Sequence, residues 1–225
     1  LPVDPSLIIG DKAPTMEEMQ RLLARESYGD WLARILNGDL GESLFFKKPV
    51  AALIGTAASA SLQLILMTIV LAAVLGAVLG AFARAVPRGA GNGVAAVLLS
   101  LPHLVPALLL LALTLAGVLS LPISGYVPFA QGWQDSIDRT TMPTIALACV
   151  PAAVLMGRIG NAAPGTVAAA FALGALEIIG VLSGLVVVET IFAIPGLGRL
   201  LVSAAMARDT PTLLPVVLLA ATAGI

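Results

Sequence analysis

Two carboxylic acids lie within or beside a long apolar stretch of this sequence. Glu177 is the only charged residue of 166–188, and Glu189 follows directly after that run. A carboxylate in hydrocarbon is energetically expensive, so such a residue usually faces the interior of a helix bundle or a water-filled path. Glu177 is therefore a candidate for lining a pathway. A purely structural buried hydrogen bond is the alternative for the same residue.

The other reactive side chains form no catalytic or metal-binding pattern. His103 is the only histidine and Cys149 the only cysteine, so we expect no metal site and no internal disulfide. Four serines lie in apolar runs without a paired histidine, and we expect them to form hydrogen bonds between helices: Ser59, Ser61, Ser100 and Ser183. There is no glycine-rich phosphate loop. We therefore expect no catalytic residues, and any ATP must bind to another chain.

The composition is that of a membrane protein. Hydrophobic residues make up 59% of the 225 positions and charged residues only 11%, and the net charge of -1 provides no basic face for nucleic acid. A membrane helix needs about 20 apolar residues. Apolar runs of roughly that length occupy residues 51–83, 89–120, 140–157, 166–188 and, ending short, 210–225, and only Glu177 in the fourth run is charged. The sequence predicts an all-α polytopic transmembrane bundle with about five spans.

Residues 1–50 differ from the rest, because they hold eight of the thirteen acids and six of the twelve bases. We assign 1–50 to an amphipathic segment outside the membrane and 51–225 to the transmembrane domain. Thr15 and Glu18 fit a capping box, which predicts a surface helix over 15–25. That helix is expected either to pack on the protein's own membrane domain or to contact the membrane surface or a partner.

Glycines indicate close helix packing and one turn. Gly76 and Gly80 in the first predicted span, and Gly180 and Gly184 in the fourth, have the four-residue spacing that lets helix backbones approach closely. Pro195 and Gly196, with Gly198, form a turn signal soon after the fourth span. This turn either returns the chain toward a substrate path or is an ordinary connection. Counting Lys and Arg in the loops does not fix the orientation, because 84–92 and the basic residues of 1–50 point in opposite directions.

An ordered set of short motifs is more specific than any of these features alone. It comprises LPVDP at 1–5, NGDLGES at 37–43 with Pro49 and Val50, LPISGY at 121–126, VVETIFAIPGLG at 187–198 and RDTP at 208–211. In this order the motifs resemble the inner-membrane permease subunit of the dipeptide/oligopeptide/nickel class of bacterial ABC importers. The resemblance covers almost the whole chain.

The resemblance implies a function and a set of partners. It implies a multi-pass subunit in the bacterial inner membrane that forms half of a pathway for peptides or a similar small solute. The implied partners are the lipid bilayer, a homologous permease, a periplasmic solute-binding protein and two cytoplasmic ATPases that hold ATP and Mg. The family topology places 1–50, 122–139 and 189–208 on the periplasmic side. Candidate pathway or gate residues are then Glu177, Glu189, Pro195, Gly196 and Gly198.

The sequence also departs from the family pattern. The long loop with the ATPase-docking helix, expected between the third and fourth spans, has no counterpart where Gly160 meets Asn161. The family's first span, an extra stretch near Ser27 and the end of the last span are likewise without counterparts. These departures leave two alternatives open. One is an ion-coupled secondary transporter that uses Glu177, and the other is a permease remnant that does not transport.

Overall fold

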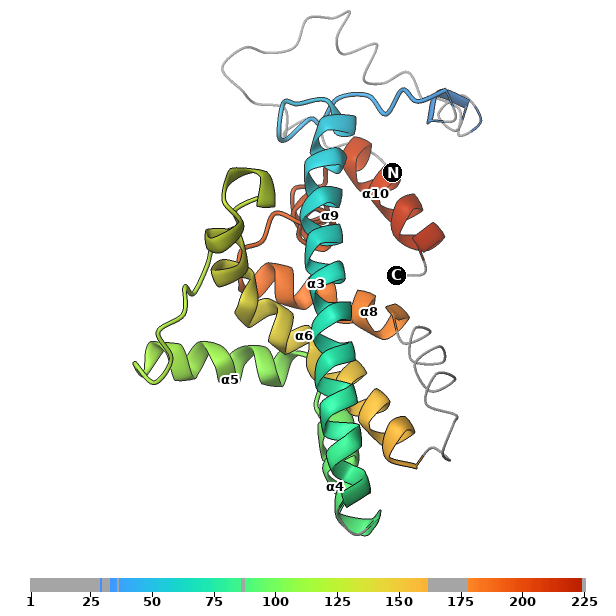
Figure 1. Ribbon diagram of the computed structural model, residues 1–225. Coiled ribbons are helices and arrows are strands. Elements are labelled where there is room, and N and C mark those ends of the chain that lie inside the picture. Colours follow the sequence, from blue (N-terminus) through green and yellow to red (C-terminus); the bar gives the residue numbers. More distant parts are fainter. Residues whose placement is uncertain (1–28, 30–32, 36, 86–87, 162–177, 224–225) are drawn as a thin grey trace, which may run out of the picture. The chain divides into compact units, whose positions relative to one another are not determined.

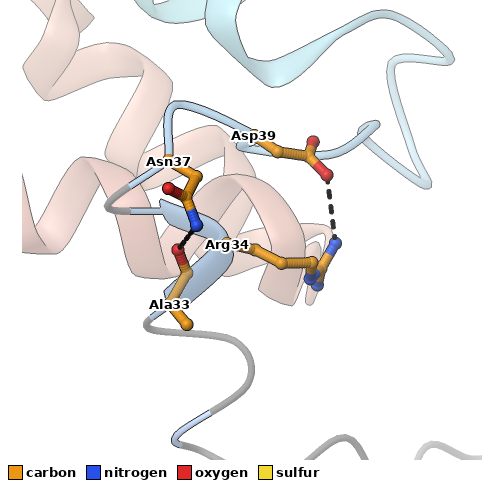
Figure 2. A network of polar contacts seen from close by, with 4 residues as sticks. All are labelled: Ala33, Arg34, Asn37 and Asp39. Atoms are coloured by element: carbon orange, nitrogen blue, oxygen red, sulfur yellow. Dashed lines mark hydrogen bonds and ion pairs between the residues drawn. The ribbon is translucent and has the colours of Figure 1, made fainter.

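The computed structural model describes residues 29, 33–35, 37–85, 88–161 and 178–223, and the chain divides into two compact units, 1–40 and 41–225. In the described part of the first unit, the side-chain amide of Asn37 donates to the carbonyl of Ala33 at 2.9 Å. Arg34 and Asp39 form an ion pair of 3.8 Å that is open to solvent (Figure 2). Exposed ion pairs contribute little to stability. The predicted helix over 15–25 lies outside the described residues.

Helices make up most of the described part of the second unit, and no β-strand occurs in that part, which confirms the predicted all-α fold. Its only strand-like contact there is an isolated bridge between Glu42 and Pro49. Its helices are α3 (Val50–Ala85), α4 (Arg88–Ser100), α5 (Leu104–Leu115), η2 (Phe129–Gln131), α6 (Trp133–Asn161), α8 (Ile178–Ile191), α9 (Leu197–Met206) and α10 (Thr210–Ala223) (Figure 1). The compact unit begins at Gly41, ten residues before the start assigned from the sequence.

Helices α3 and α6 form the central pair, and α6 crosses α3 in Figure 1. A Cβ at Gly76 would lie 2.7 Å from the Cβ of Leu155, and one at Gly80 would lie 2.7 Å from the Cβ of Ile159. Larger side chains would therefore push the two helices apart. The main core gathers residues of α3, α5, α6 and α8 with the turn after α8: Ala60, Leu64, Ala107, Met142, Ala146, Leu147, Leu185, Val188, Phe192 and Ile194.

Two helices in the described part are long and apolar enough to cross a membrane, namely α3 and α6. The predicted span over 89–120 is not one straight helix, because Gly93–Ser100 and Leu104–Leu115 are bent by 88° at the break between them. Pro102 lies in that break, and proline cannot donate the backbone hydrogen bond that a continuous helix needs. If the bent pair counts as one span, three spans are present in this part of the chain.

The described parts of the last two predicted spans are helical. Most of the predicted fourth span, including Glu177, lies outside the described residues, and α8 covers only its end. The fifth predicted span corresponds to α10, a short apolar helix with Pro215 inside it.

Helix α3 carries a regular stripe of exposed apolar side chains, which winds gradually around the helix. Every fourth residue belongs to it, and the members are Leu62, Leu66, Val70, Val74, Val78 and Phe82. The twenty-one residues from Leu62 to Phe82 rise about 30 Å in an α-helix. This length matches the hydrocarbon core of a bilayer. The first twelve residues of α3 therefore extend past one end of the stripe.

Candidate functional site around Glu189 and the start of helix α9

Glu189 lies near the end of α8, where the chain turns back into α9. The amide of Ile194 donates to the carbonyl of Glu189 at 2.9 Å, and the turn contains Ala193 with a φ of 56°. A positive φ is unusual for a residue other than glycine, so the surrounding packing must hold this turn. Glu189 itself is completely buried. The turn therefore directs the chain around the Glu189 side chain.

The Glu189 carboxylate accepts hydrogen bonds from two different helices. The hydroxyl of Ser61 in α3 donates to Oε1 at 2.5 Å, and the amide of Arg199 in α9 donates to Oε2 at 3.0 Å. Ser61 also accepts a hydrogen bond of 2.8 Å from the amide of Leu197. The first amides of a helix lack partners within it, and its N-terminus favours negative charge. We call Ser61, Glu189, Leu197 and Arg199 the Glu189 cluster.

Two glycines leave the space that the Glu189 cluster occupies. A Cβ at Gly196 would overlap the carboxylate of Glu189, and one at Gly198 would lie 2.6 Å from the Cα of Val186. A side chain at Gly198 would displace α9 from the α8 backbone, and one at Gly196 would displace the Glu189 carboxylate from its hydrogen bonds. This packing gives a physical reason for the two glycines at the first and third positions after Pro195. Pro195 itself is exposed.

The structure therefore brings four of the five predicted gate residues together: Glu189, Pro195, Gly196 and Gly198. The fifth, Glu177, is outside the described residues. The sequence prediction that Ser61 bonds between helices is confirmed. Ser100 bonds to a carbonyl of its own helix. Ser59 does so as well, and it also forms a hydrogen bond with Tyr126 of the loop before α6. The side chain of Ser183 is not described.

A second buried carboxylate lies at the other end of α9. Asp209 accepts hydrogen bonds from the Ser43 hydroxyl at 2.5 Å, the Leu44 amide at 3.1 Å and the Thr212 hydroxyl at 2.7 Å. Asp209 is 1% exposed and precedes α10 as its N-terminal cap. We call these four residues the Asp209 cluster. Sequence reasoning gave Asp209 no role, although the RDTP motif contains it and an Asp before an apolar helix is a capping signal.

A polar contact on the opposite side of α3 joins that helix to α6 and to the loop before α6. Gln63 donates to the hydroxyl of Ser136 at 2.7 Å and accepts from the hydroxyl of Tyr126 at 3.0 Å. Burial raises the pKa of Tyr126, with a smaller opposing effect from a hydrogen bond to Ser59. Tyr126 is thus a neutral donor at ordinary pH. These residues hold the first turn of α6 against α3.

Gly184 faces His103 at the break between α4 and α5. A Cβ on Gly184 would lie 2.6 Å from Cγ of His103, so the imidazole ring occupies the space that the glycine leaves. Nε2 of His103 is buried and has no hydrogen-bond partner among the described residues. The other predicted packing glycine of this helix, Gly180, lies in the first turn of α8. Within the described ranges, no three His, Cys, Asp or Glu residues are grouped to hold a metal ion.

This chain is similar in sequence to known transport proteins. No family model matches it. A Brucella abortus protein named as a peptide transport system permease is 27% identical, over 94% of this chain and 80% of the relative. A Sinorhizobium fredii protein named as a peptide ABC transporter permease is 26% identical, over 97% of this chain and 82% of the relative. The chain is a homologue of these permeases. The resemblance read from the motifs is thereby confirmed.

The relatives are longer than this chain within the aligned region. The alignment with the Brucella abortus relative is 254 positions long, whereas the chain has 225 residues, so at least 29 aligned positions have no residue of this chain. With the Sinorhizobium fredii relative the alignment is 261 positions long. The relatives therefore contain internal segments that this sequence does not.

Proposed function

We propose that this chain is the permease subunit of an ATP-driven importer and that it forms half of the translocation pathway for peptides or similar small solutes. The homology to named peptide permeases over almost the whole chain carries this proposal. The absence of any catalytic pattern in the sequence agrees with it. In this function the chain supplies the wall of the pathway, while ATP and Mg bind to two partner ATPases.

The apolar stripe of α3 supports a location in a bilayer, which we propose to be the bacterial inner membrane. Its length of about 30 Å matches the hydrocarbon core. Ser61 immediately precedes the first residue of the stripe, Leu62. The Glu189 cluster is accordingly expected at one edge of the hydrocarbon. We assign this edge to the periplasmic side, where a solute-binding protein delivers its cargo, because the family topology has the 189–208 segment there.

The Glu189 cluster is proposed to form part of the gate at that edge. Both carboxylate oxygens of Glu189 are already bound by protein donors, and the side chain is completely buried. Glu189 is therefore proposed to hold α9 in place, whereas Pro195, Gly196 and Gly198 shape the turn. Glu177 remains a proposed pathway residue on the basis of its position in an apolar run.

The decisive experiment is transport by a reconstituted complex. The chain is co-expressed with its homologous permease, the two ATPases and the solute-binding protein, and the complex is inserted into proteoliposomes. We expect uptake of a radiolabelled peptide mixture that requires ATP and stops when the catalytic glutamates of the ATPases are replaced. Uptake driven by a proton gradient without ATP would instead support the ion-coupled transporter.

One observation favours a second candidate function. At least 29 positions of the Brucella abortus relative have no residue here, and the ATPase-docking segment of the family belongs between α6 and α8. A chain without that segment would be a permease remnant. Pull-down of the ATPases by this chain distinguishes the two functions, because a remnant without the docking segment retains no ATPase.

A further inference from the structure

We infer that Ser61 is a positioning residue that makes helix α9 move together with helix α3 during the transport cycle. The inference rests on the proposed function and adds a residue and a mechanical connection to it. Neither Ser61 nor Asp209 was among the predicted gate residues.

Both ends of α9 are attached to α3 or to the segment that leads into it. At the start of α9, the Ser61 hydroxyl accepts from Leu197 and donates to Glu189. At the other end, Asp209 binds Ser43 and Leu44. The segment containing these two residues is itself fixed to the start of α3, because the amide of Val50 donates to the carbonyl of Gly41 at 3.0 Å.

Two separated attachments constrain α9 more than one would. A single contact leaves a ten-residue helix free to rotate about it, whereas attachments at both ends also fix its direction. Each attachment is buried, since Ser43, Ser61, Glu189 and Asp209 are all no more than 2% exposed. Breaking either one would leave buried polar groups without partners, which is costly. The two clusters therefore favour movement of α9 and α3 as one body.

The opposite end of α3 is held against α6. Nε of Arg84 donates to the carbonyl of Ile159 at 2.9 Å, and Gly80 lets Ile159 approach the α3 backbone. Ser61 and Arg84 are 23 residues apart, which corresponds to about 35 Å along an α-helix. A displacement of the end of α6 would thus reach α9 through a single continuous helix. Ser61 is the residue of α3 at which this displacement passes to α9.

The distance between α3 and α9 tests this inference directly. Spin labels are placed on two exposed positions outside both clusters, through Thr56→Cys in α3 and Met206→Cys in α9, in a Cys149→Ala background. Met206 is 82% exposed, and the Thr56 hydroxyl bonds only to carbonyls of its own helix. The inter-label distance in the complete complex is then measured without nucleotide and with the ATPases trapped in the ATP-bound state.

We expect one narrow distance distribution that is the same in both states, and a broad or shifted distribution after Ser61→Ala. Ser61→Thr retains the hydroxyl and is expected to restore the narrow distribution. A distance that changes between the two states in the unsubstituted Ser61 protein overturns the inference, as does an unchanged distribution in the Ser61→Ala variant.

A transport measurement separates positioning from simple stability. The number of peptides taken up per ATP hydrolysed is compared for Ser61→Ala and for the control Ser59→Ala. The Ser59 hydroxyl bonds to Thr56 of its own helix and to Tyr126 of the loop before α6, and it lies outside the Glu189 cluster. We expect Ser61→Ala to lower this ratio several-fold while ATP hydrolysis continues. The ratio for Ser59→Ala is expected to stay above the ratio for Ser61→Ala. A proportional loss of uptake and hydrolysis overturns the positioning role. Absence of ATP-dependent uptake in the unsubstituted complex would refute the proposed function, whereas the label distances would still test the connection itself.

Discussion

Replacing Glu189 by alanine is expected to destabilise the permease strongly, although the residue lies at the end of a short helix. The substitution removes the acceptor of the Ser61 hydroxyl and of the Arg199 amide. A buried donor left without a partner costs about 1–3 kcal/mol. Two such donors give an expected loss of about 2–6 kcal/mol. Removing a completely buried side chain adds a cavity contribution in the same direction.

The assay is equilibrium unfolding of the purified protein in detergent micelles, followed by circular dichroism. Glu189→Gln preserves the volume and one oxygen, but its amide group faces a donor, so its loss should lie between those of wild type and Glu189→Ala. The matched control is Thr190→Ala at the neighbouring position, which is exposed and bonded to Val186 of its own helix. We expect less than about 1 kcal/mol for this exposed change. A Glu189→Ala protein as stable as the Thr190→Ala control would refute the account of the Glu189 cluster.

Three further substitutions test other parts of the structure. Gly80→Ala places a Cβ 2.7 Å from the Cβ of Ile159 and should destabilise the α3–α6 pair by about 1–3 kcal/mol. The control Gly55→Ala has nothing within 4 Å of its Cβ and should not destabilise the protein; equilibrium unfolding of both variants measures the difference. Asp209→Ala frees the Ser43 hydroxyl and the Leu44 amide, so trypsin should cleave after Lys47 faster than in the wild type; equal cleavage rates would contradict the contact. Glu177→Gln should reduce peptide uptake several-fold in reconstituted vesicles, and normal uptake with normal assembly would remove Glu177 from the pathway.

The long helices could be predicted from the sequence because their signal is local. Residues 51–83 are uncharged and rich in good helix formers, and α3 covers that whole run. The break between α4 and α5 was missed, although Pro102 and His103 were visible in the run. Hydrophobicity alone identifies what lies in a membrane, but it does not show whether a proline is accommodated within one helix or separates two.

The site was predictable only in part, because the sequence shows local patterns and not contacts between distant residues. The motif around Glu189 indicated a turn and a gate, because its proline and glycines are close in sequence. The partners of the two buried carboxylates are distant, since Ser61 precedes Glu189 by 128 residues and Ser43 precedes Asp209 by 166. A serine in an apolar run looks the same whether it binds its own helix or another one. Only the folded arrangement separates Ser61 from Ser59.

The central claim is that this chain transports its cargo as part of an ATP-driven complex. The most direct measurement is ATP-dependent uptake of labelled peptides by proteoliposomes that contain this chain with its homologous permease, the ATPases and the solute-binding protein. We expect uptake that requires ATP and is lost when this chain is omitted. Equal uptake without this chain, or uptake that needs no ATP, would contradict it.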